Sequence, residues 1–330
     1  MRSTAARTTA EQFRIDDRAF FAVLGHDARL ELVVATDAHE GPVYVADEDA
    51  LYFTSLPRHT DIPAPGHPAV AIRRLELDGD GFPLDPQRVT TVVERANAAN
   101  GMTLDREGRL VVCEQGTRSE HAAISRLDPT TGRRVTVVDH WSGLRLNSPN
   151  DVVVARDGAI WFTDPRYGHL QGFRPEPQVG DFVYRYDPAA DRLVVVADGF
   201  DKPNGLAFSP DESVLYVTDS GANQETGSYY VDRPHHIQSF DVAGGRRLVN
   251  RRLFAATTPG FPDGIKVDTE GRVYASAFSG VQVFTPDGDL IGEIRLPGAV
   301  NFTFGGADRN VLFITADDAI WAARLAATGL

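Results

Sequence analysis

The chain has 330 residues, of which 42% are hydrophobic and 24% are charged, the balance of an ordinary soluble globular protein with a substantial core. Its formal net charge of −13 argues against nucleic acid or an anionic membrane as a partner, because both need a basic face. No segment approaches the ~20 apolar residues of a membrane-spanning helix. The N-terminus lacks the apolar core of a secretory signal, and the single cysteine, Cys113, suits a reducing compartment. We therefore expect a cytoplasmic protein.

The first 19 residues are predicted to form a flexible tail, and residues 20–330 a single domain. Helical periodicity is nearly absent: residues 15–24 and 321–330 are the only stretches in which we expect helical or frayed structure. The segment ARLELVVAT at 28–36 has the composition of a strand. It precedes the first of the repeats described next and has no repeat of its own.

From residue 40 onward the chain repeats one pattern six times: a short polar residue, an apolar strand, a turn and a second strand. We call the first polar residue of each repeat its opener; the openers are Glu40, Asn100, Asn150, Asn204, Asp263 and Asn301. They follow one another at steps of 60, 50, 54, 59 and 38 residues, compared with the ~40–50 residues of a four-stranded propeller blade. The turns carry Asp, Glu or Gly where a hairpin needs unusual backbone angles. Second strands such as LYFTS and IWFTD are rich in β-branched and aromatic residues.

Further strands complete each unit. Third strands read AISRLDP, FVYRYDP, HIQSFDV and VQVFTPDG, and outer strands read RVTVVDH, RLVVVAD, LVNRRLF and DLIGEIRLP. Repeated four-stranded units predict an all-β fold, a six-bladed β-propeller, in which residues 28–36 close the ring as the outermost strand of the sixth blade. Insertions at 57–70, 166–181 and 221–236 are expected to form loops on one face, where loops commonly carry substrate contacts.

If each repeat is the inner hairpin of a blade, the openers all point at one axis. A ring of carboxylate and amide oxygens suits a hard cation such as Ca²⁺, which takes six to eight oxygens at ~2.3–2.6 Å. Glu40 and Asp263 supply two negative charges, and Asn150 and Asn204 supply neutral oxygens. No paired His or Cys has the spacing of zinc ligands. The alternative is that Asn, Asp and Gly gather at strand starts for turn geometry alone.

Several segments together resemble the gluconolactonase branch of the senescence-marker protein/regucalcin family, over nearly all of residues 20–325. They are HEGPVY, NSPNDVVVARDGAIWFTDPRYG, KPNGLAFSPDESVLYVTDSG, FPDGIKVDTEGRVYASA and NFTFGGADRNVLFITA. The resemblance implies a six-bladed β-propeller that hydrolyses sugar lactones with one divalent cation near the axis, usually Ca²⁺, with Mg²⁺, Mn²⁺ or Zn²⁺ as alternatives. It maps the metal-binding residues onto Glu40, Asn150, Asn204 and Asp263, and the proton-transfer role onto Asp263.

Asp263 is the predicted catalytic residue. A cation on the lactone carbonyl stabilises the oxyanion that forms when water attacks, and Asp263 is the candidate base. A carboxylate that coordinates a cation is a weak base, so orientation of the water is the alternative role. Asn100 and Asn301 are candidates for substrate contact or for hydrogen bonds to the ligands. Glu114 and Arg118 are candidates for substrate contact at the rim of the pocket. The simpler interpretation is that they form an ion pair on the surface.

Four further positions near the predicted ligands, Ser148, His39, Asp164 and Asp219, are interpreted individually. Ser148 stands where the vertebrate lactonase branch has a sugar-contacting Arg, so that branch's substrate preference does not carry over. His39 is expected to orient Glu40, and Asp164 and Asp219 to accept hydrogen bonds from backbone amides. Three hypotheses remain: a Ca²⁺-dependent lactonase acting on a small lactone, as a monomer or homodimer; a hydrolase of organophosphates or other esters at the same site; and a non-catalytic calcium-binding propeller.

Overall fold

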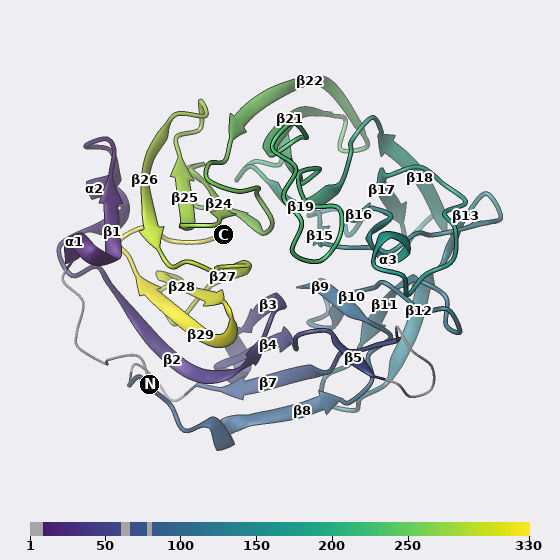
Figure 1. Cartoon of the computed structure of the whole chain (residues 1–330), viewed down its shortest axis with the longest axis horizontal. Coiled ribbons are helices and arrows are strands. Elements are labelled where there is room, and N and C mark those ends of the chain that lie inside the picture. Colours follow the sequence, from purple (N-terminus) through teal and green to yellow (C-terminus); the bar gives the residue numbers. More distant parts are fainter. Residues whose placement is uncertain (1–8, 61–66, 78–80) are drawn as a thin grey trace.

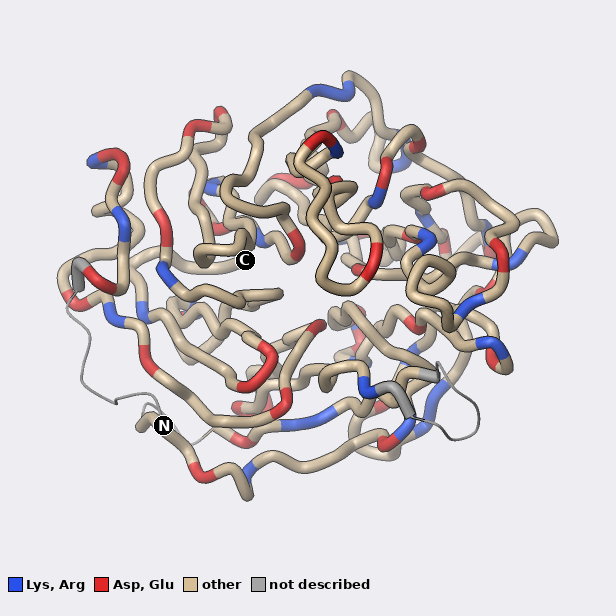
Figure 2. Tube along the Cα trace, viewed as in Figure 1, with Lys and Arg blue, Asp and Glu red and all other residues tan. Residues whose placement is uncertain are grey.

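The chain is described here from a computed structural model that covers residues 9–60, 67–77 and 81–330. The described residues form six antiparallel sheets that stand as blades around a central axis (Figure 1). The predicted six-bladed β-propeller is therefore confirmed. No helix in these ranges is long and apolar enough to span a bilayer. Lys and Arg are interspersed with Asp and Glu around the ring (Figure 2), so the net negative charge is not concentrated in one blade.

The strands of each blade are given from the axis outward. Blade 1 contains β3 (Glu40–Val45), β4 (Ala50–Thr54), β7 (Ile72–Glu76) and β8 (Val89–Val93). Blade 2 contains β9 (Ala99–Leu104), β10 (Leu110–Glu114), β11 (Ala123–Leu127) and β12 (Arg134–Val138). Blade 3 contains β15 (Val152–Val154), β16 (Ile160–Asp164), β17 (Phe182–Asp187) and β18 (Arg192–Ala197). Blade 4 contains β19 (Pro203–Phe208), β20 (Val214–Asp219), β21 (His236–Ala243) and β22 (Arg247–Ala256).

The last two blades contain strands from both ends of the chain. Blade 5 contains β23 (Ile265–Val267), β24 (Val273–Ala277), β25 (Gly280–Phe284), β26 (Leu290–Arg295) and β1 (Phe13–Ile15). Blade 6 contains β27 (Asn301–Gly305), β28 (Val311–Thr315), β29 (Asp317–Arg324) and β2 (Arg29–Ala38). Because β2 pairs with β29, for example Leu30 with Ala323, the sixth blade joins the beginning of the chain to its last repeat. This is the closure predicted from residues 28–36.

Two expectations for the ends of the chain need correction. Within the predicted tail, residues 1–8 lie outside the described residues, but β1 pairs with β26, with Phe13 opposite Ile294. Phe13 is 3% exposed, so burial of its ring holds this part of the tail against blade 5. At the other end β29 continues to Arg324, where helical or frayed structure was expected, because its backbone pairs on both sides, with β28 and β2.

The remaining elements are short. They are α1 (Thr9–Gln12), α2 (Phe20–Leu24), α3 (Tyr167–Leu170), the 3₁₀ turns η1 (Ala46–Glu48) and η2 (Pro86–Arg88), and the strands β5 (Arg58–Thr60), β6 (His67–Ala69), β13 (His140–Trp141) and β14 (Leu144–Arg145). Helix α2 lies inside the stretch 15–24 expected to be helical. The insertion 57–70 contains the hairpin β5–β6, apart from residues 61–66, which lie outside the described residues.

The core lies between the blades. Buried apolar side chains form six clusters, and each cluster is shared by two neighbouring blades. Between blades 3 and 4, for example, Trp161 packs with Leu206 and Leu215, all fully buried. Because every blade face is covered by the next blade, both faces of each sheet are apolar, and the ring supports itself without a separate central core.

The six inner hairpins turn through the same backbone conformation. Gly108, Gly158 and Gly271 have φ angles of 75°, 86° and 80° at the turns of blades 2, 3 and 5. At the equivalent turns of blades 1, 4 and 6 the positive φ falls on Asp49, Glu212 and Arg309. The turn is therefore set by the repeat itself, and glycine occupies it where the chain avoids the strain of a left-handed residue.

Candidate functional site

The openers lie at one end of the axis, where the inner strands of neighbouring blades approach each other very closely. A Cβ atom on Gly41 would lie 2.5 Å from the carbonyl oxygen of Asn100, and one on Gly205 would lie 2.4 Å from that of Asp263. In four of the six repeats a glycine follows the opener (Gly41, Gly101, Gly205 and Gly264), and in these blades only glycine lets the inner strand approach its neighbour so closely. This contact brings side chains from different blades to one point.

Hydroxyl groups of the second strands hold the opener backbones. Thr163 Oγ1 donates to the carbonyl of Asn204 at 2.6 Å, and Thr218 Oγ1 donates to that of Asp263 at 3.2 Å. In the same manner Thr315 Oγ1 donates to the carbonyl of His39 at 2.7 Å. Each bond runs from one blade to the next, so the position of an opener depends on its neighbour in the ring.

A cavity of about 330 Å³ opens at this end of the axis. Its described lining residues are His39, Glu40, Leu56, Pro57, Pro68, Val70, Ala98, Ala99, Asn100, Gln115, Asn150, Tyr167, Gln171, Phe173, Asn204, Asn223, Thr226, Gly227, Asp263 and Asp317. The four predicted metal ligands, Glu40, Asn150, Asn204 and Asp263, are all among them. Residues from the predicted loops 166–181 and 221–236 also line it, so both insertions contribute to the same cavity.

Glu40 and Asp263 are two carboxyl groups close together in a buried place. Glu40 is 3% exposed, and its Oε2 accepts hydrogen bonds from Gly41 N at 3.0 Å and Asn301 Nδ2 at 2.7 Å. Burial, and then the negative charge of Asp263, raise the pKa of Glu40. Burial likewise raises the pKa of Asp263, against a hydrogen bond with Asn204 that lowers it. Two such groups favour a cation or a shared proton between them.

The two asparagines face this pair. Asn150 Oδ1 is buried and has no hydrogen-bond partner among the described residues, although its carbonyl accepts from Gly101 N at 2.8 Å and Asn100 Nδ2 at 3.1 Å. The side chain of Asn204 acts to lower the pKa of both Asp263 and Tyr167, against the burial that raises them. An unpaired buried amide oxygen costs free energy unless something outside the protein satisfies it.

This donor set fits a hard cation. Two carboxylates and two amide oxygens match the oxygen preference of Ca²⁺, and a cation would satisfy both the unpaired oxygen of Asn150 and the facing charges of Glu40 and Asp263. Among the described residues there is no group of three or more His, Cys, Asp or Glu placed to hold a metal. Any metal site that the described residues form here therefore needs the amides as well as the carboxylates.

The two remaining openers have different positions. Asn100 lines the cavity, as its predicted substrate contact requires. Asn301 is 2% exposed and is absent from the described lining; its Nδ2 holds Glu40, and its Oδ1 accepts from Phe302 N at 2.8 Å. Of the two roles considered for Asn301, this position favours the hydrogen bond to a ligand.

Glu114 and Arg118 do not reach the cavity. Glu114 is 2% exposed; it accepts hydrogen bonds from Ser125 Oγ and from Asn97 Nδ2, and it lies 3.5 Å from Arg134. Arg118 donates to the carbonyl of Gly172 at 2.9 and 3.1 Å. The expected surface ion pair is also wrong, since Glu114 is turned into blade 2 and each residue has other partners.

Sequence reasoning considered His39 but did not identify Asp317, Tyr167 or Asp151 as contributors to this end of the axis. His39 Nδ1 lies 2.7 Å from Asp317 Oδ1, and both residues line the cavity, whereas Asp317 reads as a solvated turn residue. Burial opposes protonation of His39, but the hydrogen bond to Asp317 and the charge of Glu40 outweigh it, so the pKa of His39 is raised. Tyr167 was signalled only by its place in the loop 166–181. Asp151, directly after an opener, is 3% exposed, and its charge acts on both Glu40 and Asp263.

Asp164 and Asp219 have the predicted structural role. Asp164 accepts from Asn147 N at 2.9 Å and Ser148 N at 2.8 Å, so it holds the segment that leads to Asn150. Asp219 does the same ahead of Asn204, through Lys202 N at 2.8 Å. Ser148 Oγ donates to the carbonyl of Pro165 at 2.7 Å and does not line the cavity.

Comparison with known proteins agrees with this geometry. Residues 38–318 match the model of the SMP-30/gluconolactonase/LRE-like region. A gluconolactonase of Zymomonas mobilis is 33% identical over 299 residues, which cover 88% of this chain and 78% of the relative. The lactonohydrolase oryL of Aspergillus oryzae is 30% identical over 318 residues, 88% of this chain and 69% of the relative. The solved structure of a gluconolactonase from Xanthomonas campestris superposes with a TM-score of 0.78 at 36% identity, covering 98% of each chain.

The resemblance read from the sequence motifs is thus confirmed by the matched residues, by the identities and by the superposition. The family match spans all six openers, from Glu40 in blade 1 to Asn301 in blade 6. The chain belongs to the SMP-30/gluconolactonase/LRE-like family.

Proposed function

We propose that this protein is a metal-dependent lactonase that opens a small lactone, of the sugar type, at the cavity of Glu40, Asn150, Asn204 and Asp263. Relatives named gluconolactonase and lactonohydrolase support lactone hydrolysis. The observation that carries the metal is the unpaired, buried Oδ1 of Asn150 in the same cavity as the buried carboxyl group of Glu40 and the partly buried one of Asp263. Ca²⁺ is the cation whose oxygen preference this set fits best. Cys113 is free and buried, in keeping with the expected cytoplasmic location.

A cation held by these four residues would supply a Lewis acid that polarises the lactone carbonyl. The protein's own groups supply the rest. Asp263 is partly exposed to the cavity, whereas the Oε2 of Glu40 is held by two hydrogen bonds. Asp263 is therefore the group placed to orient a water molecule and accept its proton. Attack of this water on the carbonyl carbon, followed by cleavage of the ring C–O bond and protonation of the leaving oxygen, yields the hydroxy acid.

The walls of the cavity favour a substrate with hydroxyl groups. Besides the ligand asparagines, the side-chain amides of Asn100, Gln115, Gln171 and Asn223 line it. An amide both donates and accepts, so four of them can pair with several hydroxyl groups of a sugar-type ring. The ring's apolar face can pack on Tyr167 or Phe173, which line the same cavity.

The test is turnover of a panel of sugar and simple lactones, with phosphotriesters and aryl esters alongside, before and after treatment with a chelator. We expect lactone hydrolysis that the chelator abolishes and Ca²⁺ restores. Asp263→Asn and Glu40→Gln should each lose turnover. Glu114→Gln is the matched control, because Glu114 is an equally buried glutamate outside the cavity.

Three results would contradict the proposal. If the chelator does not affect turnover, the reaction does not depend on a metal. If phosphotriesters are cleaved faster than every lactone, the protein is an organophosphate hydrolase instead of a lactonase. Ca²⁺ binding with no turnover of any substrate would leave a non-catalytic calcium-binding propeller.

A further inference from the structure

The repeat places a second ring of residues deeper along the axis. The residue three positions after each opener is Val43, Thr103, Val153, Ala207, Lys266 and Phe304 in blade order. All six line a second cavity, of about 440 Å³. A strand rises about 3.3 Å per residue, so this ring lies roughly 10 Å from the openers along the axis. Five of the six are uncharged, and Lys266 alone breaks the pattern.

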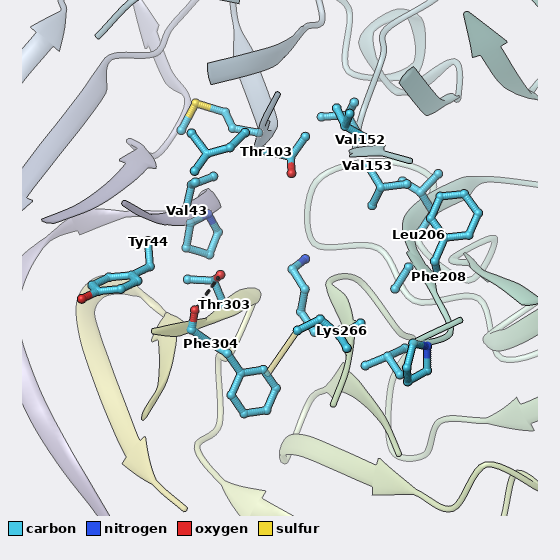
Figure 3. Close-up of a pocket in the computed structure, with 18 of the residues that line it drawn as sticks. Val43, Tyr44, Thr103, Val152, Val153, Leu206, Phe208, Lys266, Thr303 and Phe304 are labelled. Atoms are coloured by element: carbon cyan, nitrogen blue, oxygen red, sulfur yellow. Dashed lines mark hydrogen bonds between the residues drawn. The ribbon is translucent and has the colours of Figure 1, made fainter. Parts of the chain in front are cut away.

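The walls of this second cavity combine apolar and polar groups. Figure 3 shows Val43, Val153, Leu206 and Phe304 around its space. Its volume lies in the usual range for small-molecule sites, which combine apolar walls with a few polar groups. We call it the lower cavity, in contrast to the upper cavity of the openers.

Lys266 projects into the middle of the lower cavity (Figure 3). Its Nζ donates to the carbonyl of Ile265 at 3.1 Å, and no described carboxylate forms an ion pair with it within 4.0 Å. The chain has only one other lysine, Lys202, whose Nζ pairs with Asp201 at 2.7 Å. Burial raises the pKa of the buried Asp151, and the positive charge of Lys266 acts against this rise, so the two groups interact electrostatically without forming an ion pair. An ammonium that no carboxylate contacts directly, with apolar side chains around it, favours an anionic ligand.

The charges at the two ends of the axis are opposite. The upper cavity is lined by Glu40, Asp263 and Asp317, with His39 as its basic residue. The described lining of the lower cavity contains three basic residues, Arg156, Lys266 and Arg309, and one acidic residue, Glu212. This basic excess occurs in a chain whose net charge is −13.

We propose that the lower cavity binds a small amphipathic monocarboxylate, whose carboxylate pairs with Lys266 and whose apolar part packs on the valines and Phe304. One ammonium matches one negative charge, and the valines and Phe304 offer no partner to the further charge and hydration shell of inorganic phosphate. This site is separate from the proposed lactonase site, and neither its presence nor its test depends on metal or turnover.

The experiment uses hexanoate as the probe, with hexan-1-ol, hexylammonium and inorganic phosphate as comparisons, measured by calorimetry in the presence of a chelator. We expect the wild type to bind hexanoate more tightly than the other three. Lys266→Met keeps the length of the side chain and removes its charge. A hydrogen bond to a charged group contributes about 1.5–3 kcal/mol, so this variant should bind hexanoate at least about tenfold more weakly, with hexan-1-ol unchanged. Lys202→Met is the control and should bind hexanoate like the wild type.

A second measurement avoids dependence on a folded variant. Reductive methylation with ¹³C-formaldehyde labels both lysines and keeps their charge, so two lysine signals can be followed by NMR. Hexanoate should shift the Lys266 signal and leave the Lys202 signal in place.

Four results would overturn the proposal. They are an unmoved Lys266 signal at millimolar hexanoate, unchanged affinity in a folded Lys266→Met, equal binding of hexylammonium or phosphate, and loss of hexanoate binding in Asp263→Asn. The last would place the ligand in the upper cavity.

Discussion

Replacement of Asn301 by alanine tests how the ring holds its central carboxylate. Asn301 comes from β27 of the last blade, and its Nδ2 donates to Glu40 Oε2 of the first blade at 2.7 Å. The two residues are 261 positions apart in the chain and almost fully buried. In Asn301→Ala, Oε2 of Glu40 would lose this bond and keep the one from Gly41 N at 3.0 Å.

The magnitude follows from the two bonds that are lost. The hydrogen bond to a buried carboxylate contributes about 1.5–3 kcal/mol, and the bond from Phe302 N to Asn301 Oδ1 adds about 1 kcal/mol. We therefore expect the free energy of unfolding to fall by about 3 kcal/mol. Groups that hold a metal ligand in place commonly change metal affinity about 10–100-fold, so Ca²⁺ binding should weaken by a similar factor.

Urea denaturation in chelator measures the first effect, and calorimetric titration with Ca²⁺ measures the second. Asn250→Gly is the matched control: Asn250 Nδ2 also donates to a carboxylate, that of Asp241, at 2.7 Å, but in an exposed place. Glycine replaces Asn250 in this control because the residue has a φ of 54°, and alanine would be strained in that left-handed conformation. If Asn301→Ala destabilises the protein no more than Asn250→Gly does, and if its affinity for Ca²⁺ is unchanged, the assignment of Asn301 as the support of Glu40 is refuted.

Three further predictions concern the backbone and the turns. Thr163→Val removes the bond to the carbonyl of Asn204 and should lower the free energy of unfolding by about 1–2 kcal/mol and weaken Ca²⁺ binding. Gly205→Ala places a Cβ 2.4 Å from the carbonyl oxygen of Asp263, so urea denaturation should report a loss of about 3 kcal/mol or more. Burial acts to raise the pKa of Asp105, but hydrogen bonds from Arg109 outweigh it and lower that pKa. Asp105 therefore stabilises the fold above its unfolded pKa of about 3.9, and the stability difference from Asp105→Asn should shrink as the pH falls below that value.

Controls for these variants lie on the surface. Thr136→Val on the exposed outer strand β12 and Gly81→Ala, where an added Cβ meets nothing within 4 Å, should leave the stability close to that of the wild type. Equal effects for the buried and exposed threonines would contradict the role of the inter-blade hydroxyls. A stability difference for Asp105→Asn that persists unchanged into acid would contradict the sign of its pKa shift.

Much of the architecture is encoded locally. The opener, the β-branched second strand and the turn recur within about 20 residues, so they can be read without knowledge of the rest of the chain. The turns repeat so closely that Asp49, Glu212 and Arg309 take the same left-handed conformation as the glycines of the other blades. The closing strand, residues 28–36, was predictable because its composition is that of a strand and it precedes the first repeat, so it belongs to none of the six repeats.

The cavity itself was only partly predictable. Repeat equivalence identified Glu40, Asn150, Asn204 and Asp263 as side chains of one ring, and all four line it. Equivalence alone could not separate these from Asn301, which stands behind Glu40. It also gave no sign that Glu114 turns away from the cavity to bond with Asn97, since that depends on the packing of blade 2.

By itself, then, the sequence determined the blade, its turns and the polar start of each inner strand, because neighbours within a few residues decide these features. The tertiary structure decided which polar groups meet. Closure of the ring brings His39 to Asp317 across 278 positions and joins β1 to blade 5. It also places Lys266 in the lower cavity, where no described carboxylate forms an ion pair with it within 4.0 Å. Contacts between distant blades depend on the geometry of the closed ring, and no local pattern in the chain carries that information.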